Sequence, residues 1–359
     1  MRRRHTTTCG VLFAGVLLQC SCSLMLRTFR TGGEEQLKPA ATASVKGGPR
    51  VIIFALDGTG PAPLLEAIRS GKAPHIASLL GAEKGADLFE HAYAAPRALT
   101  ILPSSTIAAW AAIFTGKPPA LNGVPGDEWF VRETVTFHAP VPVSVRDTLD
   151  VTKVVDDDLV GKSLKVPTLF HLVGRRSHVS LLSVHDGATL YTTIAPAAFV
   201  DVVRRLISGT MGGDNPEHSL SAGIDLVSQG KNASPYEVFD GQKLVPIHDY
   251  LTAHPRPDLI HLEKRMNELS AGPYGNRAGD ILLLARACAN VPVDERYVFA
   301  ASSHYTWHGS ACWEDGHVPF ILARQGGSGD ELRTLMTEFG GASPSVMALT
   351  PLVRELFRQ

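Results

Sequence analysis

The chain has 359 residues, of which 44% are hydrophobic, 19% charged and 7% aromatic. This composition excludes a disordered or fibrous protein and leaves enough apolar side chains for a sizeable core. With 34 Lys and Arg against 35 Asp and Glu, the formal net charge is −1. Because the charges balance and the sequence has no long basic run, we expect no nucleic-acid patch.

Residues 1–26 are predicted to be a signal peptide of the lipoprotein type. The basic start Arg2–Arg4 precedes the apolar stretch Val11–Leu18, which is too short to span a membrane. Cys20 and Cys22 follow, and either could become the acylated first residue of a bacterial lipoprotein. We therefore expect an exported protein in the periplasm or cell envelope, attached to the membrane through an N-terminal lipid anchor. An uncleaved N-terminal anchor is the alternative.

Residues 27–50 are rich in Gly, Ala, Thr and charge, which predicts a flexible tether before one domain over residues 51–359. That domain opens on the continuous apolar run Val51–Leu56, which predicts a strand buried on both faces. Similar runs lie at 179–184, 280–285, 297–301 and 318–323, and helical patterns at 63–69, 106–115, 167–173, 196–207, 331–339 and 345–357. This alternation predicts an α/β fold with a mostly parallel central sheet covered by helices on both faces.

Two residues near predicted element ends are candidates for chemistry. Asp57 directly follows the first predicted strand, where ligand groups gather in open α/β sheets, although Asp-Gly is also a common turn pair. Thr106 begins the predicted helix 106–115, where backbone N–H groups and the helix dipole favour an anion. A hydroxyl in that position can attack phosphorus if a metal lowers its pKa, and the alternative is an ordinary helix N-cap.

These residues occur in an order that resembles the alkaline phosphatase superfamily, most closely its type I phosphodiesterase/nucleotide pyrophosphatase branch. After Asp57, the segment Pro103–Thr106 matches the family's Pro-x-x-Thr, and Thr115–Pro119 matches its Thr-Gly-x-x-Pro. Leu121–Phe130 resembles the His-Gly-Ile/Val segment that follows. The resemblance implies that Thr106 is the nucleophile and a metal ligand, and that Asp57 is a metal ligand. The family's phosphate-contacting Asn falls on Ala109 here.

A late segment extends the resemblance and also shows where the chain departs from it. Residues 307–321 resemble the superfamily's late His-Gly-Ser/Thr and Val-Pro-Leu-Ile region, which makes His308 a metal ligand by resemblance. The sequence has no Ser-Asp-His-Gly motif, and Ser303 stands where its Asp would be. The superfamily's two-metal centre takes three Asp and three His, so we expect an incomplete ligand set here. A divalent ion, zinc being the expected one, would gain ligands only if Asp258, His261 or His304 replaced the missing side chains.

Two functions follow from these observations. The first is an exported, metal-dependent phosphoric ester hydrolase that acts on a small phosphoester substrate with a Thr nucleophile. The second is a catalytically silent, envelope-anchored relative that kept the fold and lost its metal sites. A sulfatase is disfavoured because the sequence has no Cys/Ser-x-Pro-x-Arg motif, and the sequence points to no protein partner.

Overall fold

The computed structural model describes residues 50–138, 163–173, 179–185, 188–194, 224–229, 236–240, 242–292, 296 and 308–357. They fall into two units. In the first unit the structure describes one antiparallel hairpin, β4 (Val179–His185) with β5 (Ala188–Ile194). All other described residues belong to the second unit. The predicted signal peptide, most of the predicted tether, the predicted strand 297–301 and the predicted helix 196–207 lie outside the described residues.

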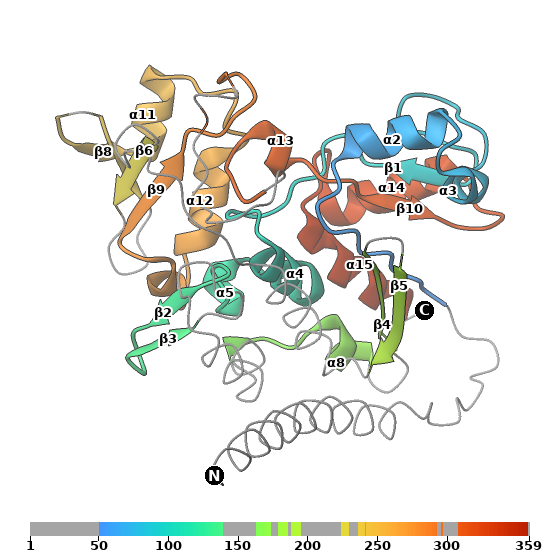
Figure 1. Ribbon diagram of the computed structural model, residues 1–359, viewed down its shortest axis with the longest axis horizontal. Coiled ribbons are helices and arrows are strands. Elements are labelled where there is room, and N and C mark those ends of the chain that lie inside the picture. The colour runs from blue at the N-terminus through green and yellow to red at the C-terminus, as the bar shows by residue number, and fades with distance from the viewer. Residues whose placement is uncertain are drawn as a thin grey trace, which may run out of the picture. The chain divides into compact units, whose positions relative to one another are not determined.

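The second unit combines helices with short strands (Figure 1). Its helices are α2 (Pro61–Arg69), α3 (Pro74–Leu80), α4 (Thr106–Thr115), α5 (Pro119–Asn122), α8 (Leu169–Val173), α11 (Ile247–Ala253), α12 (Leu262–Ser270), η3 (Gly275–Ala278), α13 (Trp313–Gly316), α14 (Gly329–Gly340), η5 (Val346–Ala348) and α15 (Leu349–Leu356). Its strands are β1 (Ala92–Ala94), β2 (Trp129–Val131), β3 (Thr136–His138), β6 (Ile224–Gln229), β7 (Glu237–Phe239), β8 (Leu244–Pro246), β9 (Ile281–Ala285) and β10 (Ile321–Ala323). The helices predicted within the described residues are confirmed, although the last one divides into η5 and α15.

The strand pairing differs from the prediction. Four strands form a sheet in the order β8-β7-β6-β9, while β1 pairs with β10 and β2 pairs with β3. All of these pairs are antiparallel. The α/β class is in keeping with this mixture of helices and sheets, but the described residues do not form the mostly parallel central sheet that we predicted. The apolar run in β9 was expected to lie in a parallel sheet, and it instead pairs antiparallel with β6.

The apolar run Val51–Leu56 is extended but belongs to no strand pair among the described residues. The side chains of Val51 and Ile53 pack against a buried cluster formed by α8 and α15. Ile52, Phe54 and Leu56 point the other way and are 78%, 75% and 52% exposed. The prediction of burial on both faces is therefore wrong in the described structure, because alternate side chains of an extended chain point to opposite sides and only one side is covered.

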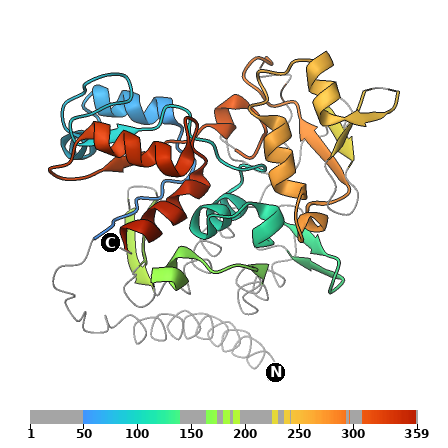
Figure 2. The same ribbon diagram turned by 180° about the vertical axis from the view of Figure 1, so that it is seen from behind.

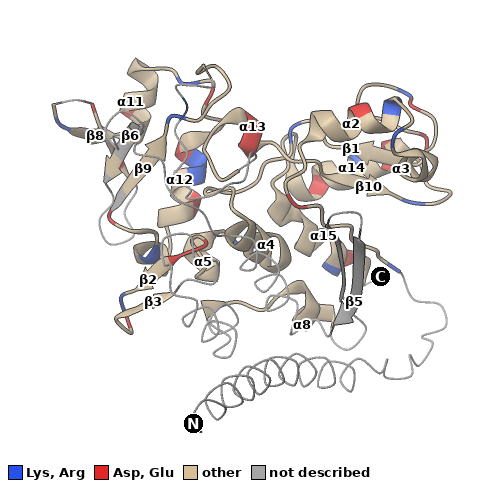
Figure 3. Ribbon diagram, viewed as in Figure 1, with Lys and Arg blue, Asp and Glu red and all other residues tan. Residues whose placement is uncertain are grey.

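Helix α4 is a buried support for its first residue, Thr106. Its ten residues carry no charged side chain, and the helix is tan throughout in Figure 3. Ala108 and Ala112 are fully buried and pack with Ile101 in one apolar cluster. The helix ends at Gly116, whose φ of 65° is left-handed and lets its N–H bond the Ala112 carbonyl. Small side chains and a defined end therefore fix the position of the helix N-terminus.

A second buried cluster contains side chains of β6, β7, β9, α11 and α12, and Figures 1 and 2 show α12 beside β9. Within this cluster Cys288 and Cys312 form a disulfide with Cα atoms 5.1 Å apart. The bond joins the segment after β9 to the start of α13. The sequence alone did not indicate that these two cysteines pair. Both cysteines are 2% exposed. The disulfide therefore fixes the chain within the buried core at Cys312, four residues after His308.

Candidate functional site

Asp57, Thr106 and His308 lie together at the N-terminus of α4. The Thr106 hydroxyl donates to Asp57 Oδ1 and Oδ2 over 3.3 and 3.4 Å. On the other side, His308 Nε2 lies 3.5 Å from Asp57 Oδ1. The structure therefore brings the three predicted site residues together around one carboxylate, although they are far apart in the sequence.

Their exposure differs in a way that suits a reactive site. Thr106 is 9% exposed, whereas the side chains of Asp57 and His308 are 47% and 37% exposed. A ligand from solvent can therefore reach the carboxylate and the imidazole, with the hydroxyl beneath them on the buried helix. Ala109, where the family has a phosphate-contacting Asn, packs into the apolar cluster of α4.

His308 is oriented by the segment that precedes α4. Its Nδ1 donates to the Ser104 carbonyl over 2.8 Å, and because a carbonyl can only accept, Nδ1 carries a proton and Nε2 faces Asp57. The hydrogen bond with Asp57 raises the pKa of His308 to about 9, although partial burial opposes this. Partial burial also opposes ionisation of Asp57, but the hydrogen bonds with His308 and Thr106 and the charge of His308 hold the pKa of Asp57 below its ordinary value. At neutral pH the two side chains therefore form an ion pair.

Two donor-atom distances at Asp57 are compatible with one small divalent cation. Tetrahedral coordination with bonds of about 2.0–2.2 Å places neighbouring ligand atoms about 3.3–3.6 Å apart. Asp57 Oδ1 lies 3.3 Å from Thr106 Oγ1 and 3.5 Å from His308 Nε2, in agreement with that spacing. Across the described part of the chain, this site included, no group of three or more His, Cys, Asp or Glu side chains could hold a metal ion. The described residues therefore supply donors for one cation and not for two.

The residues predicted as replacement ligands have other surroundings. Arg256 donates to both oxygens of Asp258 over 2.9 and 2.6 Å, and these hydrogen bonds hold the pKa of Asp258 below its usual range. His261 is exposed at the start of α12, where it lines an open groove of about 740 Å³. That groove contains none of the three side chains around Asp57. His304 lies outside the described residues.

Asp127, to which the sequence analysis gave no role, also lies at the N-terminus of α4. The backbone N–H of Ile107 donates to Asp127 Oδ1 over 3.3 Å. The chain thus places its own carboxylate on one amide of the expected anion site. Burial raises the pKa of Asp127 to about 6, against the opposing effect of the hydrogen bond from the Ile107 N–H. An Asp in a loop gives no sequence signal for this contact, which depends on the tertiary fold.

The hydroxyl at the start of this buried helix lies within hydrogen-bond reach of a carboxylate that is paired with an imidazole, which is compatible with a hydroxyl nucleophile beside its base. The model of the type I phosphodiesterase / nucleotide pyrophosphatase family matches residues 51–178. The predicted resemblance to this family of the alkaline phosphatase superfamily is thereby confirmed over that span, which includes Asp57 and Thr106. No curated protein and no solved structure matches the chain. The match supports, at a general level, hydrolysis of small phosphoesters.

We predict that Asp127→Asn stabilises the protein at pH 8 and not at pH 4. A carboxyl whose pKa rises from 3.8 in the unfolded chain to about 6 in the folded chain costs stability progressively between about pH 4 and 6, and fully above that range. A shift of that size corresponds to about 1–3 kcal/mol, which the neutral amide should recover. Urea unfolding at the two pH values measures the difference.

The exposed Glu66 on α2 provides a matched control. Glu66→Gln makes the same carboxyl-to-amide change and should alter the free energy of unfolding by less than about 0.5 kcal/mol at either pH. Equal stability of Asp127→Asn and the parent at pH 8 would show that burial of this carboxylate carries no cost.

Proposed function

We propose that this chain is a metal-dependent phosphoric ester hydrolase in which Thr106 is the nucleophile. One observation supports this most strongly: the Thr106 hydroxyl lies at the start of a buried helix and within 3.3 Å of Asp57, which is paired with His308. The resemblance implies roles for these same residues, and two of them lie within the span matched by the family model.

The reaction would proceed by two displacements at phosphorus. The hydrogen bond to Asp57 directs the Thr106 proton toward the carboxylate and leaves an Oγ1 lone pair for attack. The new O–P bond forms as the bond to the leaving oxygen breaks. That oxygen departs with the electron pair and takes up the proton that Thr106 gave to Asp57. One water then attacks the phosphothreonine, the Thr106 O–P bond breaks, and a proton of that water restores the Thr106 hydroxyl as phosphate or a phosphomonoester is released.

Asp57, Thr106 and His308 are the side chains that would hold a divalent cation, and zinc suits their mixture of oxygen and nitrogen donors. When bound, such an ion lowers the pKa of the hydroxyl and neutralises charge on the phosphate oxygens. The hydrogen bond from His308 Nδ1 to the Ser104 carbonyl keeps Nε2 directed at Asp57 and free of a backbone partner.

A catalytically silent relative is the second candidate, and one observation favours it. At the site the described residues offer one Asp, one His and one hydroxyl. The described part of the chain contains no larger cluster of metal-ligating side chains. Stable catalytic zinc sites have three protein ligands, so a weak donor set would leave the fold without turnover.

We predict that Thr106→Ala lowers kcat for p-nitrophenyl phosphate and bis(p-nitrophenyl) phosphate by about 10³-fold or more in the presence of zinc, because the attacking oxygen is lost. Ser105→Ala is the matched control, since this neighbouring residue is equally buried at 9% exposure. It should cost less than about tenfold. Circular dichroism should show that both variants fold. Equal activity of Thr106→Ala and the parent would refute the assignment.

We also propose that the protein is exported and lipid-anchored. The buried disulfide supports export, because disulfides form and persist in oxidising compartments. Within the described residues, no helix has the length and hydropathy of a membrane span. The leader itself, with Cys20 and Cys22, lies outside the described residues.

Intact-mass measurement of the detergent-extracted protein tests this proposal. A cleaved lipoprotein should lack about twenty N-terminal residues and carry added acyl mass, as its charged start, apolar core and cysteines predict. A variant with both Cys20 and Cys22 changed to Ser should lose the acyl mass. A full-length precursor found free in the cytoplasm would contradict the proposal.

A further inference from the structure

Two segments of the chain meet at the site, and their relative position sets its geometry. One is residues 101–106, which lead into α4, and the other is residues 308–312, which lead into α13. The Ser104 hydroxyl donates to the Ser310 carbonyl over 3.0 Å, and His308 donates to the Ser104 carbonyl over 2.8 Å. A shift of either segment would therefore move His308 relative to Thr106.

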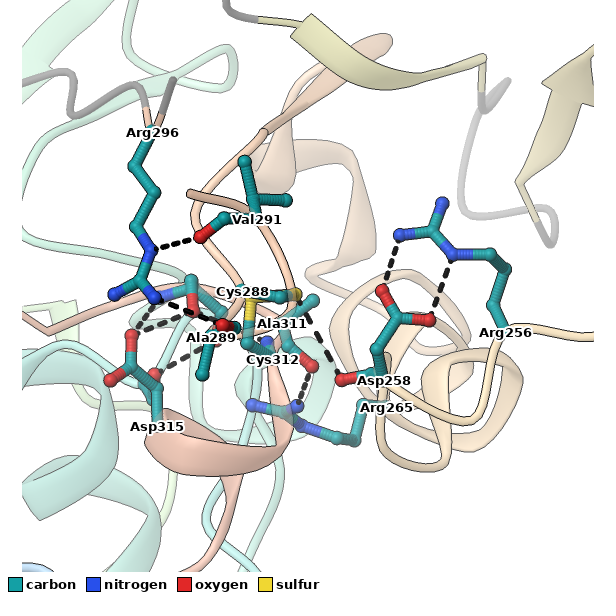
Figure 4. The surroundings of a disulfide bond; sticks show 12 residues. Arg256, Asp258, Arg265, Cys288, Ala289, Val291, Arg296, Ala311, Cys312 and Asp315 are labelled. Carbon is teal, nitrogen blue, oxygen red and sulfur yellow. Dashed lines mark hydrogen bonds and ion pairs between the residues drawn. A yellow bond between two sulfur atoms is a disulfide. The ribbon is translucent and has the colours of Figure 1, made fainter. Parts of the chain in front are cut away.

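Arg265 of α12 contacts both segments from the buried side. Its Nη2 donates to the Ile101 carbonyl over 2.8 Å, and its Nη1 donates to the Ala311 carbonyl over 3.1 Å. The whole residue is 1% exposed. Figure 4 shows the guanidinium at the Ala311 carbonyl, beside the Cys288–Cys312 disulfide. One rigid, planar group thus fixes two carbonyls that belong to different halves of the site.

The contribution of Arg265 to folding stability does not by itself explain why a charged side chain is buried at this position. Among the described residues no carboxylate lies within ion-pair distance of Arg265, and its buried Nε has no hydrogen-bond partner. Burial lowers the pKa of Arg265 to about 10, so the side chain is still charged at neutral pH. Glu268 and Asp315 act on this charge from beyond ion-pair distance and only partly offset the effect of burial. Burying a charge without a direct ion pair is costly, and an apolar side chain of similar size would avoid that cost.

The surroundings leave room for the guanidinium. Gly316, at the end of α13, has no side chain, and a Cβ there would lie 2.2 Å from Ile260 Cγ2 and 3.1 Å from Arg265 Nη1. The residue after Ala311 is Cys312, so the disulfide holds the accepting carbonyl in place. Donor and acceptor are therefore both restrained.

We propose that Arg265 is a positioning residue: its two hydrogen bonds fix the Thr106 segment and the His308 segment relative to each other. Its effect on turnover rests on the proposed hydrolase function, whereas its effect on the position of the segments does not. Arg265 does not contact the reacting atoms and acts through Ile101 and Ala311.

Arg265→Lys tests the proposal, since lysine keeps the charge but cannot span both carbonyls with a rigid fork. Lys264→Arg, on the exposed side of the same helix, is the matched exchange of one cation for another. Amide hydrogen exchange of the full chain should be at least tenfold faster in residues 101–107 and 308–312 of Arg265→Lys, and unchanged in Lys264→Arg. With p-nitrophenyl phosphate, kcat should fall 10- to 100-fold while KM stays within threefold, because misplacement affects attack more than binding.

Each other outcome overturns a defined part of this account. Failure of Arg265→Lys to fold, or unchanged exchange in both segments, would assign Arg265 a purely structural role. Unchanged kcat in Arg265→Lys, together with loss of activity in Thr106→Ala, would overturn the positioning role and leave the hydrolase function standing. Activity that survives Thr106→Ala would overturn the proposed nucleophile, and hydrogen exchange would then decide the role of Arg265 by itself.

Discussion

The ion pair between His308 and Asp57 is the contact on which the candidate site depends, yet it cannot hold the site together. Both side chains are more than one third exposed, and exposed ion pairs contribute little to stability because water and salt screen them. The restraint comes from the buried groups behind the pair. Arg265, Ser104 and the Cys288–Cys312 disulfide fix the Thr106 and His308 segments relative to each other, and Asp57 contacts the side chains of both segments.

Two carboxylates, those of Asp57 and Asp127, lie at the N-terminus of α4. Asp127 already accepts a hydrogen bond from Ile107, and Asp57 accepts one from Thr106. A phosphate approaching Thr106 would meet two carboxylates as well as the favourable helix dipole. In the proposed hydrolase, either the positive charge of a protonated His308 or that of a cation bound at Asp57 would offset that repulsion.

Local patterns in the sequence predicted the parts of the fold that depend on near neighbours. The uncharged run after Ser105 predicted α4, and the resemblance to a known family placed Asp57 and Thr106 at one site. Strand direction was not predictable, because pairing depends on segments far apart in the sequence, and the apolar run in β9 is compatible with either direction. Arg265 was missed for a similar reason: an arginine on an amphipathic helix is normally exposed, and only the tertiary fold shows that this one is buried.

The central claim is that Asp57, Thr106 and His308 form a single donor set. Elemental analysis of the purified full chain after dialysis against zinc tests it most directly, with Asp57→Asn as the variant and Asp258→Asn as the control. The account predicts no more than one zinc ion per chain, lost in Asp57→Asn and retained in Asp258→Asn, because the Asp258 carboxylate is bound by Arg256. Two tightly held ions per chain, or zinc that remains in Asp57→Asn, would contradict it.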